Sequence, residues 1–155
     1  SDRRTLEDDE SGALLVDQLQ SYGHKLKERN ICKDNRYQIR NILSEWIINE
    51  SVQAVITTGG TGITGTDGTP EAIQPLLDKT IDGFGEMFRS LSYQNIKTST
   101  LQSRAFAGVA NGTFIFCLPG SPGACKDGWN FLIKEQLDIR TKPCNLVELM
   151  PRLKE

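Results

Sequence analysis

The chain has few of the residues on which several common chemistries depend. It contains one histidine, His24, and its four cysteines lie far apart without a C-x-x-C pair. Histidine-based catalytic triads and zinc sites are therefore not expected. The scattered cysteines are typical of reduced thiols in a cytoplasmic protein rather than of disulfides. His24 follows Gly23 at a helix end and is expected at the surface, not as a catalytic base.

A strong charge of one sign and a long apolar run are also missing. Lysine and arginine number 18 against 20 acidic residues, a net charge of −2, so no basic field favours nucleic acid or an anionic membrane as partner. No apolar run approaches the ~20 residues of a membrane-spanning helix. With 155 residues, 37% of them hydrophobic, the chain suits one globular domain over residues 1–155.

The most informative stretch is a glycine-rich loop at residues 57–69, after an apolar run at residues 52–56 that predicts a buried strand. Thr69 as N-cap and Pro70 as first helical residue predict that a helix follows. In an open α/β sheet such a loop lies at the carboxyl end of a strand, where ligands bind. Its glycines and N–H groups can hold an anion, and Asp67 beside it favours a divalent cation. The alternative is a tight turn with an exposed aspartate.

The start of the chain predicts a helix that Ser11 caps and Gly23 closes. In a βαβ layout a strand should precede this helix, and none does. Either a strand is missing before residue 1, or the sheet is short by one. Residues 24–32 alternate weakly and predict a strand near the sheet edge.

Asn35 predicts the cap of a second amphipathic helix, which leaves Asp34 between a strand end and a helix start. Asp34 is then either a site acid or a loop carboxylate. Further on, residues 83–86 are expected to interrupt helical structure. Arg104 could hold a phosphate or carboxylate with two hydrogen bonds, or pair with a surface acid.

Two apolar runs at residues 105–110 and 113–118 flank Asn-Gly, a strong hairpin signal. The hairpin adds one antiparallel strand to an otherwise parallel sheet. The second run leads into another glycine-rich turn, residues 119–123, ahead of a helix. Two such turns after two apolar strands are expected to face each other across one rim of the sheet, which favours a binding cleft.

Taken together, several stretches resemble the MoaB/MogA-like molybdopterin-binding family of molybdenum cofactor biosynthesis. The main ones are residues 57–71, 83–86 and 118–122, and the supporting ones are residues 1–3, 9–12, 35–40 and 100–105. The likeness covers essentially the whole chain. It implies an α/β fold, a three-layer α/β/α sandwich whose mostly parallel sheet has one antiparallel edge hairpin. Family members open with a strand just before the segment that Ser1-Asp2-Arg3 resembles, which matches the strand missing here.

The resemblance also implies a function: binding of molybdopterin and, in the adenylyltransferase branch, transfer of AMP from Mg-ATP to its terminal phosphate. Asp67 and Asp34 match acidic positions expected in catalysis and in holding Mg²⁺. The matches to binding positions are Gly59, Gly60, Thr61 and Gly62 in the phosphate loop, Pro119, Gly120 and Ser121 at the pterin side, and Glu86 and Arg104.

The chemistry suits these residues, because the acceptor phosphate is itself the nucleophile and the protein supplies positioning and charge neutralisation. Thr64-Gly65-Thr66 lacks the arginine that the adenylyltransferase branch can carry just before Asp67, which weakens the prediction of ATP handling. The alternatives are a non-catalytic molybdopterin-binding or scaffold member, and a domain for another phosphorylated ligand. The family also implies a homo-oligomer, a trimer or hexamer. The apolar residues at 146–150 and at 84–88 either form its interface or cap the monomer's own core.

Overall fold

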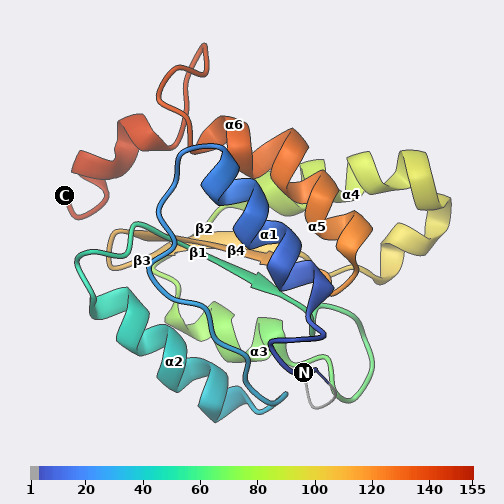
Figure 1. Cartoon of the computed structure of the whole chain (residues 1–155). Helices are drawn as coiled ribbons and strands as arrows, with labels where there is room; N and C mark the ends of the chain where they lie inside the picture. Colours follow the sequence, from blue (N-terminus) through green and yellow to red (C-terminus); the bar gives the residue numbers. More distant parts are fainter. Residues whose placement is uncertain (1–3) are drawn as a thin grey trace.

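The computed structural model describes residues 4–155, and the motif at residues 1–3 lies outside the described residues. A central sheet lies between two layers of helices (Figure 1). In chain order the elements are α1 (Glu10–Ser21), α2 (Arg36–Ile48), β1 (Ala54–Thr58), α3 (Thr69–Ile73), the 3₁₀ turn η1 (Gln74–Leu76), β2 (Lys79–Thr80), α4 (Asp82–Ile96), the 3₁₀ turn η2 (Lys97–Gln102), β3 (Phe106–Ala110), β4 (Thr113–Leu118), α5 (Pro122–Gly128), the π-helical turn η3 (Trp129–Ile133), α6 (Lys134–Gln136) and the 3₁₀ turn η4 (Val147–Arg152).

The strands lie in the order β1-β4-β3-β2. β1 and β4 are parallel, with Val55 opposite Ile115. β3 and β4 form the predicted antiparallel hairpin, whose turn residues Asn111 and Gly112 both have positive φ. The two-residue strand β2 pairs antiparallel with β3. Fewer pairings are parallel than expected, because residues 24–32 do not join the sheet among the described residues.

Strand β4 divides the core between the two faces of the sheet. Phe114, Phe116 and Leu118 belong to a cluster with residues of α1, α4 and α5. Ile115 and Cys117 belong to a second cluster, with residues of α2 and α3. This alternation confirms the three-layer α/β/α class, because successive side chains of a strand point to opposite faces. Burial raises the pKa of the Cys117 thiol to about 12.

Two predicted helix caps are wrong, and in both cases the hydroxyl has a distant partner. Asp9, not Ser11, caps α1 by accepting the N–H of Gly12 at 3.0 Å, while the buried Ser11 hydroxyl donates to the carbonyl of Gly120. At α3 the Thr69 hydroxyl donates to the Gly59 carbonyl at 2.9 Å and makes no cap. Hydroxyls bond equally well to any accessible carbonyl, so the fold decides which one they reach. The cap by Asn35 on α2 is confirmed.

Two further expectations about elements are corrected. Within residues 4–155, the segment 24–32 forms no strand; it runs between α1 and α2 without pairing to a neighbouring strand. Residues 83–86 do not interrupt a helix but lie in the first turns of α4. There Gly85 approaches the carbonyl of Ala105 so closely that a Cβ would lie 2.7 Å from the oxygen. The glycine therefore serves close packing of the helix on β3 rather than a break.

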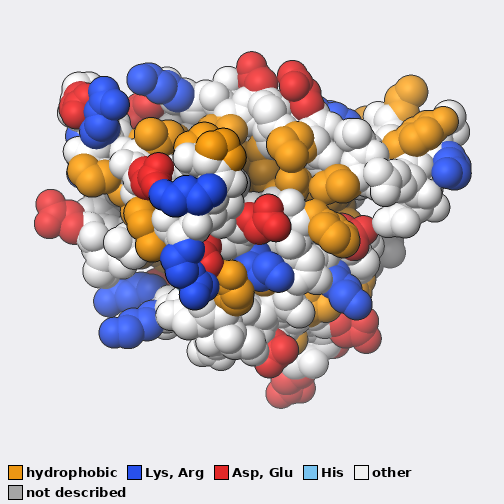
Figure 2. All heavy atoms as spheres, turned by 90° about the horizontal axis from the view of Figure 1, so that it is seen from above, with side chains coloured by type: hydrophobic (Ala, Val, Ile, Leu, Met, Phe, Trp, Pro, Cys, Tyr) orange, Lys and Arg blue, Asp and Glu red, His pale blue; other side chains and the backbone are white. Residues whose placement is uncertain are grey.

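The apolar tail belongs to the core of its own chain. Leu146, Met150 and Leu153 pack against the cluster that also contains Phe84 and Phe88. These residues therefore pack within the monomer, whereas Leu149 and Met87 from the same two apolar segments stay exposed, at 45% and 58%. Seen over α1, α4 and α5, charged side chains of both signs are interleaved with apolar ones (Figure 2). Within residues 4–155, no helix combines the length and apolarity needed to cross a membrane.

Candidate functional site

The two glycine-rich turns meet at the carboxyl ends of β1 and β4, as predicted. Gly59 donates its N–H to the carbonyl of Leu118 at 2.9 Å, and the Thr58 hydroxyl donates to the carbonyl of Pro119 at 2.9 Å. A Cβ on Gly120 would lie 3.4 Å from the Cα of Gly59. Gly59 also has a φ of +101°, a conformation that other residues adopt only with strain. Both turns therefore depend on glycine for their close approach.

The carboxylate of Asp67 turns inward, onto its own loop. It accepts hydrogen bonds from the hydroxyl of Thr64 at 2.6 Å and from the Thr64 N–H at 2.9 Å. The Thr64 hydroxyl is the main cause that lowers the pKa of Asp67, and the N–H groups of Thr64 and Gly62 add to it. Asp67 is thus ionised at neutral pH and bonds to the N–H groups that the sequence analysis assigned to an anion.

Arg104 holds this loop in shape from outside. Its Nε donates to the carbonyl of Gly62 and its Nη2 to that of Asp67, both at 2.7 Å, and its own N–H donates to the carbonyl of Thr61. The guanidinium also forms an ion pair with Glu71 and is the main cause that lowers the pKa of that carboxyl. Arg104 therefore pairs with an acid, one of its two predicted roles, and little of its donor capacity remains for a phosphate.

The second turn carries contacts from the amino end of the described chain. Its Ser121 is the N-cap of α5 and accepts the N–H of Ala124. The Gly120 carbonyl accepts from the Ser11 hydroxyl at 2.8 Å and from Nη1 of Arg4 at 3.2 Å. These two contacts connect the amino end of the described chain to the rim, which is the edge of the sheet where both glycine-rich turns lie. The partners are more than a hundred residues apart in the sequence.

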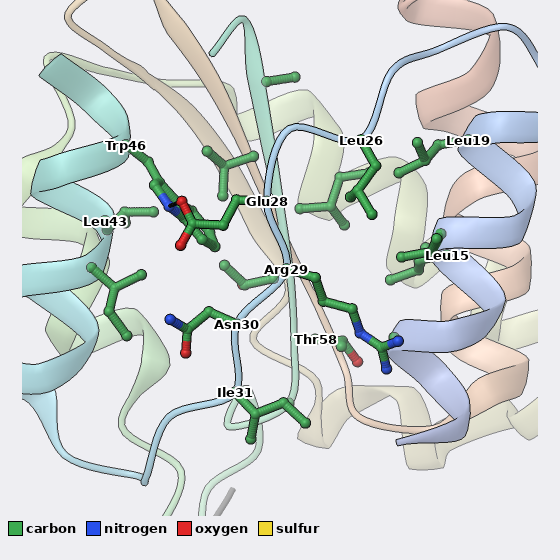
Figure 3. A pocket seen from close by; sticks show the side chains of 18 of the residues that line it. Leu15, Leu19, Leu26, Glu28, Arg29, Asn30, Ile31, Leu43, Trp46 and Thr58 are labelled. Carbon is green, nitrogen blue, oxygen red and sulfur yellow. Dashed lines mark hydrogen bonds between the residues drawn. The ribbon is translucent and has the colours of Figure 1, made fainter. Parts of the chain in front are cut away.

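The remaining predicted site residues lie farther out. Asp34 is exposed in the turn before α2. It lines, together with Asp67, a cavity of about 1020 Å³ that also borders β1 (Figure 3). Glu86 is exposed on α4, beside the contact between Gly85 and Ala105. Among residues 4–155 no three acidic, histidine or cysteine side chains converge as a metal site. Mg²⁺ at this rim would take much of its coordination from water and substrate phosphates, which is usual for this ion.

Sequence reasoning missed four residues that shape the rim: Thr58, Glu71, Ser11 and Arg4. Glu71 had a usable signal, because it lies directly after Thr69-Pro70, in the first turn of the helix that leaves the loop. A carboxylate there is within reach of a cation that binds the loop. Thr58 and Ser11 had none, because a hydroxyl in a strand or first helical turn predicts no particular distant partner.

Comparison with known proteins finds relatives that are similar in sequence and in fold. Residues 1–139 match the family described as probable molybdopterin binding domain. Molybdenum cofactor biosynthesis protein B of Escherichia coli (strain K12) is 54% identical over 145 residues, which cover 94% of this chain and 85% of the relative. A crystal structure of molybdenum cofactor biosynthesis protein B is similar with a TM-score of 0.85 at 44% identity, covering 88% of this chain and 86% of that one. The tungsten cofactor synthesizing protein MoaB from Pyrococcus furiosus has a TM-score of 0.72 at 38% identity, with 83% and 81% covered.

Proposed function

Because the chain belongs to the molybdopterin-binding family that includes molybdenum cofactor biosynthesis protein B, we propose that it binds molybdopterin at the rim and transfers AMP from Mg-ATP to its terminal phosphate. The bond between the α- and β-phosphates of ATP breaks, and pyrophosphate leaves. The observation that carries the proposal is that the two glycine-rich turns meet at one edge of the sheet, and that the first of them holds the ionised Asp67. A ligand with a phosphate at one end and a flat ring at the other suits two adjacent turns.

The residues of the rim would have separate roles in binding and in transfer. The loop clamped by Arg104 presents N–H groups at Gly62 and Thr64, which a phosphate would take over from the Asp67 carboxylate. Released from the loop, Asp67 would face the phosphates and, with Asp34, hold Mg²⁺. Bound there, Mg²⁺ would neutralise charge between acceptor phosphate and nucleotide. Transfer then needs no protein nucleophile, in agreement with the missing histidine base.

Asp67→Asn tests this role, because it keeps the size and hydrogen-bonding capacity of the side chain and removes the charge. We expect AMP transfer to molybdopterin to fall by ~10²–10³-fold, the effect of losing a contact of ~3–4 kcal/mol in the transition state. Molybdopterin binding should survive, because the glycines and N–H groups are unchanged. The matched control is Asp17→Asn, which makes the same change at an exposed position of α1. A rate within a few-fold of an active wild type would remove Asp67 from the mechanism and leave Asp34.

A second candidate is a non-catalytic molybdopterin-binding or scaffold protein. Two observations favour it: Thr66 stands where the adenylyltransferase branch can carry arginine, and Arg104 is engaged with Glu71 and with loop carbonyls. Few cationic donors then remain for a triphosphate. Calorimetric titration with Mg-ATP separates the two functions. Absence of nucleotide binding, in a protein that binds molybdopterin, would favour the second.

We also propose a cytoplasmic homo-oligomer, a trimer or hexamer, as the family resemblance implies. The described cysteines form no disulfide. Two apolar side chains near the junction of α4 and η2 are exposed: Ile96, at 51%, and Leu101, at 82%. Association with another copy of the chain would bury such apolar surface. Sedimentation at micromolar concentration that shows only a 17.3 kDa species would contradict the proposed oligomer.

A further inference from the structure

The carboxylate of Asp67 occupies the position of an anion in its own loop. Its Oδ2 accepts the hydroxyl of Thr64 at 2.6 Å and the N–H of the same residue at 2.9 Å. A Cβ on Gly62 would lie 2.6 Å from this oxygen, so the carboxylate lies directly against the backbone of Gly62. Backbone N–H groups that converge on one point form an anion site. The N–H groups expected to bind a phosphate are thus bonded to a carboxylate of the same chain.

The backbone of this loop is held by contacts that do not involve the carboxylate. Arg104 donates to the carbonyls of Gly62 and Asp67, one on each side of the exposed residues 63–66. Between these two points, the N–H of Asp67 donates to the carbonyl of Thr64 at 3.0 Å. The side chain of Asp67 can therefore leave Thr64 while the bonds that shape the loop remain. This makes the position of the carboxylate an equilibrium that a ligand can shift.

The hydroxyl of Thr64 is the side-chain group that holds the carboxylate inward. Its bond to Asp67 is shorter than the bond from the Thr64 N–H, and it is the first cause that lowers the pKa of Asp67. Hydrogen bonds to an ionised acceptor are the stronger ones. The hydroxyl of Thr66 lies 3.2 Å from that of Thr64 and supports it without replacing it. Loss of the Thr64 hydroxyl should therefore release the carboxylate without any change in charge.

A phosphate and the carboxylate of Asp67 exclude each other from this loop, because they need the same N–H groups and carry charge of the same sign. Phosphate affinity is then reduced by the fraction of molecules in which the carboxylate is turned inward. A divalent cation also binds the carboxylate best when Asp67 has left the loop. Both ligands favour the same released position, so each must strengthen the binding of the other by an equal factor.

We propose that Thr64 is a positioning residue that keeps the carboxylate of Asp67 in the phosphate site until a phosphate group displaces it. Phosphate and divalent cation then bind together rather than singly, and the loop favours a phosphate ester that arrives with its metal ion. This inference rests on the proposed function, because it requires phosphate to bind at this loop. It gives Thr64 the opposite sign from a ligand of phosphate, since its hydroxyl weakens phosphate binding.

Thr64→Val tests this sign, because it keeps the shape of the side chain and removes only the hydroxyl. Inorganic phosphate is titrated in the presence of Mg²⁺, and the amide signal of Gly62 is followed by NMR. We expect Thr64→Val to bind phosphate about 10-fold more tightly than the wild type, which is ~1.4 kcal/mol and in the range of one hydrogen bond to a charged group.

Two variants serve as controls for the loss of the hydroxyl. Thr64→Ser keeps a hydroxyl at this position and should restore the phosphate affinity of the wild type. Thr66→Val makes the same change at an exposed neighbour and leaves both bonds from Thr64 to Asp67 in place, so its affinity should also equal that of the wild type. A merely structural role of Thr64 would weaken phosphate binding in Thr64→Val and would not tighten it.

The coupling between the two ligands is measured by the same titration with and without Mg²⁺. In the wild type, Mg²⁺ should tighten phosphate binding by at least ~10-fold, because it holds the released carboxylate of Asp67. Asp67→Asn lacks the charge that the cation needs, so the effect of Mg²⁺ should fall to about two-fold or less. This comparison also corrects for the association of Mg²⁺ with phosphate in solution, which is the same for both proteins.

Three outcomes would overturn the positioning role of Thr64. Phosphate binding could be unchanged or weaker in Thr64→Val, or Thr66→Val could tighten it equally. Mg²⁺ could also affect the wild type and Asp67→Asn to the same degree. In each of these cases phosphate still binds at the loop, so the proposed function is untouched. If phosphate binds to none of the proteins, with or without Mg²⁺, the positioning role and the proposed function fail together.

Discussion

β4 and β1 lie side by side in register, yet they differ in burial. All six residues of β4 are buried, whereas in β1 only Val55 is. Both strands are apolar, and helices cover both faces of each. The difference is lateral: β4 pairs with β1 and β3, while β1 pairs with β4 alone in the described chain. A hydrophobic run thus becomes a sealed core strand only when both of its edges have partners.

Truncation of one side chain in each strand tests this contrast most strongly. Phe116 is 1% exposed and packs on Phe84 with ring centroids 5.4 Å apart. We expect Phe116→Ala to lower the free energy of unfolding by ~3–5 kcal/mol. Ile56, half-buried beside the cavity, should lose only ~1–2 kcal/mol as Ile56→Ala, because it has less packing to lose. Urea unfolding measures both; equal losses would show that the edge of β1 is as well packed as β4.

The loop at the end of β1 depends on side-chain contacts instead of a second neighbouring strand. Arg104→Ala removes the bonds to the carbonyls of Gly62 and Asp67 together with the ion pair to Glu71. We expect a loss of ~2 kcal/mol, a fall of about 4–8 °C in melting temperature. Arg89→Ala is the control, because Arg89 donates to a single carbonyl, that of Ala105. If the two variants have the same melting temperature, Arg104 does not stabilise the loop.

Acid should loosen this loop before it affects β4. The pKa of Asp67 is lowered by the Thr64 hydroxyl, and that of Glu71 by Arg104. A carboxyl whose pKa is lower in the folded protein stabilises it above the unfolded value, about 4, and loses this contribution as pH falls through the folded value. Amide exchange of the loop should therefore quicken below about pH 4. Glu71→Gln should weaken this pH dependence, and an unchanged profile would contradict the role of the ion pair.

A cysteine substitution should have the smallest effect on stability, and cysteine labelling tests whether β4 is closed to solvent. Cys117 of β4 is fully buried and its pKa is raised to about 12, so a thiol reagent should reach it only on unfolding. Cys144 is exposed and should react at once. Cys144→Ser should remove that rapid phase and change the free energy of unfolding by less than about 0.5 kcal/mol. Rapid labelling of Cys117 in the native protein would show that β4 is not sealed.

Local sequence chemistry was sufficient for the elements whose signals lie within a few residues. Asn-Gly between two apolar runs specified the β3–β4 hairpin, because both turn positions need positive φ. Asn35 specified the start of α2, where its side chain accepts from the N–H groups of the next turn. The two glycine-rich turns specified the rim, since both follow strands that end at the same edge of a sheet.

Only the tertiary structure decided which distant groups these residues reach. The hydroxyls of Ser11 and Thr69 bond to glycine carbonyls of the two turns, although each was expected to cap its own helix. Arg104 and Glu71 are 33 residues apart and meet because β3 and α3 both begin at the same rim. Residues 24–32 have the pattern of a strand and do not form one, because a strand exists only through bonds to a neighbour. Hydrophobic period and turn chemistry are properties of the local chain, whereas partners of hydroxyls, ions and strand edges depend on what the fold brings within reach.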